Sequence, residues 1–64
     1  MNNENYLTPE EASQLTGIPM NSLAVLRSKK QKFPFYKIGG YIRYKKSEVI
    51  EVIENGKINV EKED

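Results

Sequence analysis

The chain has 64 residues, enough for one small domain, and its 38% hydrophobic and 30% charged residues are typical of a globular protein. It contains no Cys and no His, which excludes disulfides, thiol catalysis and the commonest zinc ligands. Its longest aliphatic run, residues 23–26, is too short to span a membrane, so we expect a cytoplasmic protein.

The net charge of +1 conceals a strong segregation of charge along the chain. Residues 1–26 carry a net charge of −3, residues 27–46 carry +8 without a single acidic residue, and residues 47–64 carry −4. Five of the six aromatic residues also lie in the basic middle. Cations interleaved with aromatic side chains are typical of a surface that binds nucleic acid. The alternative is a half-buried hairpin whose solvent-exposed face is rich in lysine.

A capping box predicts the first helix. Thr8 can cap the helix while Glu11 returns the bond to the Thr8 amide, and Pro9 suits the first helical position. We expect this helix to span residues 9–16, with Gly17 as its left-handed end. Leu7 and Ala12 have the spacing of a hydrophobic staple, and Ala12 and Leu15 are expected to face the core.

A second helix is predicted over residues 20–29, after a tight turn that ends at Pro19. Leu23 and Leu26 share one direction on this helix and are expected to face the core. The opposite direction is short and uncharged, and it holds Asn21, Ala24, Val25 and Ser28. Two short helices joined by a glycine-containing turn predict a helix-turn-helix, whose second helix commonly enters the DNA major groove.

Two β-prone runs, residues 35–38 and 41–45, flank a Gly-Gly pair, which predicts a two-residue hairpin. Ser47 is expected to cap a third helix that ends at residues 55–56. This helix has an apolar stripe of Val49, Ile50, Val52 and Ile53 and an outward acidic ridge of Glu48, Glu51 and Glu54. The predicted fold is mainly α: a winged helix-turn-helix with a two-stranded wing and a third helix. We expect residues 1–5 to be disordered, residues 6–56 to form the domain, and residues 57–64 to form a charged tail.

Candidate DNA contacts follow from this arrangement. Amide and hydroxyl side chains can bond to base edges, and small methyl groups can contact thymine, whereas cations contact phosphates without reading sequence. The candidates are Asn21, Ser22, Ala24, Val25, Arg27, Ser28, Lys29, Lys30, Lys32, Lys37, Tyr41 and Arg43. Two alternatives stay open: Asn21 satisfies the first turn of its own helix, and Val25 packs against the wing. For Tyr36 and Tyr44, packing of the hairpin on the first helix is favoured over stacking on bases.

Catalysis is not expected. The chain offers no Ser/His/Asp or Cys/His set and no phosphate-binding glycine loop. The carboxylate pairs Glu10/Glu11 and Glu48/Glu51 fall in a capping box and on a solvated helix face. We therefore expect no enzyme activity, no cofactor, no metal and no small-molecule ligand.

The stretches LTPEEASQLTGIP and FPFYKIGGYIRYKKSEV resemble the winged helix-turn-helix of the excisionase and AlpA-like family, which is related to the DNA-binding head of MerR regulators. The resemblance extends from Leu7 to Ile53. It implies a DNA-binding protein of a phage or mobile element that binds repeated sites beside an attachment site, bends the DNA and assists a tyrosine recombinase in excision. Some relatives regulate transcription instead.

The resemblance also implies positions for the contacts. It places groove-reading residues at Met20, Asn21, Ser22, Ala24 and Val25, and wing residues at Lys37, Gly39, Gly40, Tyr41 and Arg43. The chain departs from the family pattern at Pro19, Ala24 and Tyr41, where Ser or Thr, an aromatic residue and Arg are common. Expected partners are double-stranded DNA, a tyrosine recombinase and adjacent copies of the chain. The alternative is a protein-interaction module that uses the acidic ridge, whereas RNA binding is less compatible with a helix-turn-helix.

Overall fold

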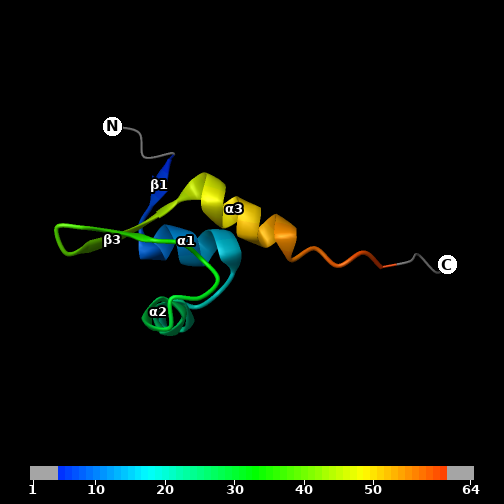
Figure 1. Cartoon of the computed structure of the whole chain (residues 1–64), viewed down its shortest axis with the longest axis horizontal. Helices are drawn as coiled ribbons and strands as arrows, with labels where there is room; N and C mark the ends of the chain where they lie inside the picture. Colours follow the sequence, from blue (N-terminus) through cyan, green and yellow to red (C-terminus); the bar gives the residue numbers. More distant parts are fainter. Residues whose placement is uncertain (1–4, 61–64) are drawn as a thin grey trace.

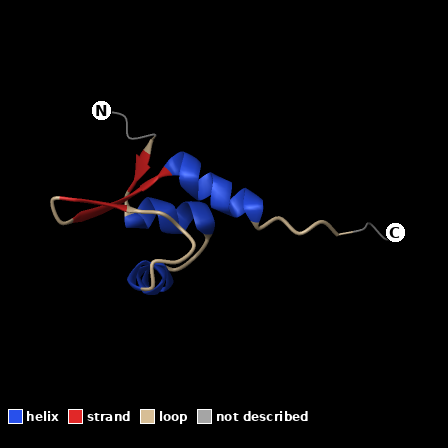
Figure 2. Ribbon diagram, viewed as in Figure 1, coloured by secondary structure: helices blue, strands red, loops and turns tan. Residues whose placement is uncertain are grey.

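The computed structural model describes residues 5–60, and residues 1–4 and 61–64 lie outside this part. It confirms the predicted mainly α fold with a hairpin wing (Figure 2). In chain order the elements are β1 (Tyr6–Leu7), α1 (Pro9–Thr16), α2 (Met20–Ser28), β2 (Tyr36–Ile38), β3 (Tyr41–Lys45) and α3 (Lys46–Asn55). Figure 1 shows α2 end-on below α1, so these two helices cross steeply. The hairpin of β2 and β3 extends from one end of the molecule and the C-terminal segment from the other.

The capping box at the start of α1 is confirmed. The Glu11 amide donates to Thr8 Oγ1 at 3.1 Å, and the Thr8 amide donates to Glu11 Oε1 at 2.9 Å. Gly17 ends the helix with φ 77°, and its amide donates to the Ser13 carbonyl. Two side chains then tie the turn to α1, because Ser13 Oγ donates to the Ile18 carbonyl at 2.7 Å and Thr16 Oγ1 accepts from the Ile18 amide at 3.1 Å. These bonds set the direction in which the chain enters α2.

The core is small and draws on every element except β2. Its buried side chains are Leu7, Ala12, Leu23, Phe33, Tyr44 and Val49, and Ile18, Leu26, Phe35, Ile42 and Val52 pack against them. The expectation that Leu15 faces the core is wrong, since this side chain is 40% exposed. Leu15 lies in the last turn of an eight-residue helix, one turn beyond Ala12, at the margin of the core. On α3, Val49 and Val52 face the core, whereas Ile50 and Ile53 remain partly exposed.

The sheet has three strands rather than the two that were predicted. Its order is β1-β3-β2 and both pairings are antiparallel. Strand β1 contains only Tyr6 and Leu7, which pair with Lys45 and Tyr44. A two-residue strand is too short to show a hydrophobic period, and its partner lies far along the chain, so the sequence pattern carries no sign of it.

The same pairing explains why Ser47 does not cap α3. The helix begins at Lys46, with Lys45 in the cap position and no side-chain cap. The Lys46 amide donates instead to the Asn5 carbonyl at 2.8 Å. The chain therefore passes directly from strand β3 into the helix, and the predicted cap at Ser47 is wrong. This bond also ties Asn5 to the fold, although residues 1–5 were expected to be disordered. The other four lie outside the described residues.

Other predicted boundaries differ by one residue, since α2 ends at Ser28 and β2 begins at Tyr36. Residues 57–60 of the predicted charged tail form neither helix nor strand, and the rest of that tail lies outside the described residues. Ile58 and Val60 are both 80% exposed. The core therefore ends with α3.

Candidate nucleic-acid interface

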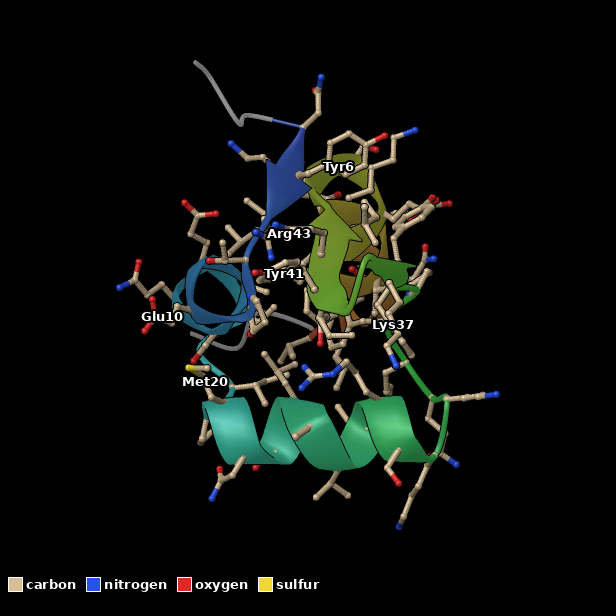
Figure 3. All side chains as sticks on the ribbon, turned by 90° about the vertical axis from the view of Figure 1, so that its left-hand side faces the viewer. Tyr6, Glu10, Met20, Lys37, Tyr41 and Arg43 are labelled. Atoms are coloured by element: carbon tan, nitrogen blue, oxygen red, sulfur yellow. The ribbon has the colours of Figure 1, made fainter. Side chains whose placement is uncertain are left out.

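Helix α2 presents the predicted uncharged face to solvent. Leu23 is fully buried and Leu26 packs beside it, so these two leucines fix the rotation of the helix. Val25 is 52% exposed, which contradicts the alternative that it packs against the wing. Met20 lies at the start of the helix and is 45% exposed (Figure 3). The other exposed side chains of this helix are Asn21, Ser22, Ala24 and Ser28.

The first turn of α2 closes through the backbone. Pro19 occupies the cap position without a side-chain cap, and its carbonyl accepts from the Leu23 amide at 3.0 Å. Asn21 lies within this turn, and its side chain is exposed. A contact between Asn21 and a base edge stays a prediction.

Arg27 connects α2 to the sheet. Its Nη1 atom donates to the Tyr44 hydroxyl at 2.7 Å, and its guanidinium carbon lies 6.0 Å from the centre of the Tyr44 ring. Tyr44 is almost fully buried, so this bond satisfies a polar atom inside the core. Arg27 is half-buried, and the structure gives it a role in packing besides the predicted phosphate contact.

The segment after α2, residues 29–32, is here named the lysine turn. All its residues are exposed, and the buried Phe33 anchors the segment that follows. An open hollow is lined by Lys30, Gln31, Lys32, Phe33, Pro34 and Phe35. Gln31 was not among the predicted contacts, although its position within a run of cations was a signal for it. Three lysines and an amide thus continue the exposed face of α2.

The wing is the hairpin of β2 and β3. Gly39 and Gly40 have φ values of 55° and 88°, as a type I′ turn requires, so the predicted two-residue hairpin is confirmed. Tyr41 is 68% exposed beside this turn. Lys37 pairs with Ile42, whose side chain packs on the core, so Lys37 lies on the face of the sheet that is turned toward α2 (Figure 3).

Arg43 lies on the other face of the wing. It pairs with Tyr36, one position away from the Lys37 pair, and side chains alternate between the two faces of a strand. Its Nη1 atom donates to the Ile42 carbonyl at 2.7 Å, and its guanidinium carbon lies 5.7 Å from the centre of the Tyr41 ring. The structure therefore separates the predicted wing contacts Lys37 and Arg43 between two faces of the sheet.

Tyr36 and Tyr44 lie on opposite faces of the sheet, and only Tyr44 packs as expected. Tyr44 packs in the core, but Tyr36 packs against Tyr6, with ring centres 6.1 Å apart, rather than against α1. The Tyr36 hydroxyl donates to Glu48 at 3.2 Å. Partial burial, followed by the Glu48 carboxylate, raises the pKa of the Tyr36 hydroxyl above its ordinary value. Glu48 is thus half-buried, whereas Glu51 and Glu54 of the acidic ridge stay exposed.

Residues 5–60 contain no cluster of three or more His, Cys, Asp or Glu side chains that could hold a metal ion. None of the helices in this part of the chain is long and apolar enough to cross a membrane. The exposed face of α2 offers hydrogen bonding and apolar contact, and the lysine turn attracts anions.

Comparison with known proteins gives a family. Neither the curated proteins nor the solved structures include a significant match to this chain. The model of a family described as a helix-turn-helix domain matches residues 6–57, which include all three strands and all three helices. The match covers most of the chain, and the crossed helices α1 and α2 are the two helices of the motif. The chain belongs to the helix-turn-helix domain family, a class of domain that supports binding of double-stranded DNA.

Proposed function

We propose that this protein binds specific sites on double-stranded DNA and has no enzymatic activity. The observation that carries the proposal is the exposed, uncharged face of α2, which is followed directly by the exposed lysine turn. An uncharged helix face offers base-reading groups, and adjacent lysines attract phosphates, so both halves of DNA recognition lie on one continuous surface. A DNA-binding role would place the protein with the nucleoid in the cytoplasm.

Each part of the surface then has a role. Helix α2 enters the major groove, where Asn21 bonds to a base edge and the methyl groups of Ala24 and Val25 contact thymine. The lysine turn contacts phosphates beside that groove. The wing lies against the neighbouring minor groove or backbone, with Lys37 on the face turned toward α2 and the exposed Tyr41 beside the turn at the tip.

We propose further that the protein is the excisionase, or recombination directionality factor, of a phage or mobile element. In this role it binds and bends DNA beside an attachment site and assists a tyrosine recombinase. The support is the resemblance of the stretch from Leu7 to Ile53 to the excisionase and AlpA-like pattern. A single domain of this size buries only about 600–1,000 Å² of protein surface on DNA, so adjacent copies would add specificity.

The first experiment is selection of binding sites from a pool of random duplexes. We expect a recurring short motif for the natural chain. The variant Asn21→Ala should bind random duplex as before but lose about 1–3 kcal/mol of discrimination at one position of the motif. Recovery of no motif would contradict sequence-specific binding.

The second experiment separates the two biological roles. Excision is measured on a plasmid that carries the selected sites beside an attachment site, with the recombinase of the same element. Stimulated excision and a bent DNA in permuted gel-shift fragments support the excisionase. Unchanged excision together with altered transcription from a promoter at those sites supports the AlpA-like regulator instead.

A further inference from the structure

Two lysines of the lysine turn have a backbone conformation that side chains rarely adopt. Lys30 and Lys32 have φ values of 55° and 70°. Within residues 5–60, every other residue with positive φ is a glycine. A side chain crowds the backbone in this region, whereas glycine enters it without that cost.

The bonds of the turn show why the backbone is left-handed there. The Gln31 amide donates to the Leu26 carbonyl and the Lys30 amide donates to the Arg27 carbonyl, which together form a Schellman motif with Lys30 at its left-handed position. The Phe33 amide donates to the Gln31 carbonyl at 2.8 Å, which makes Lys32 the centre of a tight three-residue turn. Glycine is the common residue at the first of these positions and would relieve the strain at both. The backbone alone therefore gives no reason for lysine.

The side chains of these lysines do not support the core either. Both residues are exposed, and the nearest buried side chain belongs to Phe33, which follows the turn. Cations near the C-terminus of α2 do complement the helix dipole, but this effect acts on a cation with any backbone conformation. The amides of Lys30 and Gln31 are already bonded to carbonyls of α2, so an anion here would meet ammonium groups.

We propose that the lysine turn is a phosphate clamp in which Lys30 and Lys32 stand at glycine positions because their ammonium groups contact phosphates of one DNA strand. The clamp lies at the end of α2 and would hold the strand that borders the groove occupied by this helix. Both lysines help to line an open hollow, which leaves room beside them for the sugar-phosphate chain. This inference rests on the proposed function, and it adds that stability is given up for DNA affinity at these two residues.

The test is the double variant Lys30→Gly/Lys32→Gly, whose stability and DNA affinity should move in opposite directions. Release of the backbone strain should raise Tm by about 4–8 °C. Loss of two phosphate contacts should lower affinity for a random 30-base-pair duplex at least about tenfold at moderate salt. The slope of log K against log salt should become less negative by about two.

Three controls make the result specific. Lys30→Arg/Lys32→Arg keeps the charge and the strain, and should keep the affinity and the slope. Lys30→Asn/Lys32→Asn removes the charge with a residue that tolerates left-handed backbone, and should lose affinity like the glycine pair. Lys57→Gly removes an exposed lysine beyond α3, and should change neither the DNA affinity nor the salt slope.

The outcomes separate the clamp from the proposed function. If the natural chain binds the duplex and the glycine pair binds it equally well with the same slope, the clamp is wrong and the DNA-binding function stands. If Lys30→Gly/Lys32→Gly has a lower Tm than the natural chain, the claim that these lysines cost stability is wrong. If the natural chain does not bind the duplex at any salt concentration, both proposals fail.

Discussion

Among single residues, Arg27 has the most consequential contact, because it joins α2 to the core. Its hydrogen bond to the Tyr44 hydroxyl is 2.7 Å long and satisfies a buried polar atom. The side chain lies on the flank of α2, between the buried leucines and the exposed face. The local sequence predicts mainly a phosphate contact for Arg27, because its partner Tyr44 lies 17 residues away and is not visible in the local pattern.

Replacement of this side chain should destabilise the fold. We expect Arg27→Ala to lower the free energy of unfolding by about 1–3 kcal/mol, because the Tyr44 hydroxyl is left buried without a partner. Tyr44→Phe is the matched control, since it removes the hydroxyl but keeps the ring. In a Tyr44→Phe background the arginine substitution should cost clearly less. Equal losses in both backgrounds, measured by urea unfolding, would show that the two residues are not coupled.

The elements differ in how far the sequence predicts them. Helix α1 is predicted to the residue, because Thr8, Glu11 and Gly17 carry its start and end within the local sequence. Strand β1 and the start of α3 are missed, because both depend on pairing between residues 5–7 and the distant residues 44–46. Local signals specify helices and tight turns, whereas short strands are determined by partners far along the chain.

In the wing turn, backbone strain can be tested separately from steric clashes with neighbouring atoms. A Cβ added at Gly40 meets no atom within 4 Å, yet φ there is 88°, so a side chain would be strained by the backbone alone. We expect Gly40→Ala to lower the free energy of unfolding by about 1–2 kcal/mol. Gly39→Asn should be nearly neutral, since asparagine is favoured at the first position of a type I′ turn. Equal stability of the two variants would argue against this turn geometry.

The candidate site is likewise predictable in part. The exposed face of α2 follows from helical spacing, because Leu23 and Leu26 define the buried side. The left-handed backbone at Lys30 and Lys32 does not follow from the sequence, since lysine is a poor signal for that conformation. The separation of Lys37 from Arg43 depends on strand register, which a hairpin of two glycines determines only once its turn type is known.

Across the whole molecule, the basic residues and the acidic ridge occupy different segments of the chain. The basic residues cluster between residues 27 and 46, whereas the acidic ridge lies on α3.

Replacement of the exposed ridge residues in the variant Glu51→Gln/Glu54→Gln should leave DNA affinity unchanged or slightly higher, because negative charge near DNA is unfavourable. If the ridge binds the recombinase, the same variant should lose recruitment in a pull-down with that protein. A loss of DNA affinity instead would show that the ridge takes part in the DNA surface. Glu48 is left in place because it holds Tyr36.

The measurement that tests the central claim most directly is fluorescence anisotropy of a labelled 30-base-pair random duplex, titrated with the protein at several salt concentrations. If five or six phosphates are neutralised, log K should fall with log salt at a slope of about −5. Affinity should therefore drop about 10³-fold between 50 and 200 mM salt. Failure to bind at low salt, or binding that does not change with salt, would contradict the assignment of the basic segment as a DNA-binding surface.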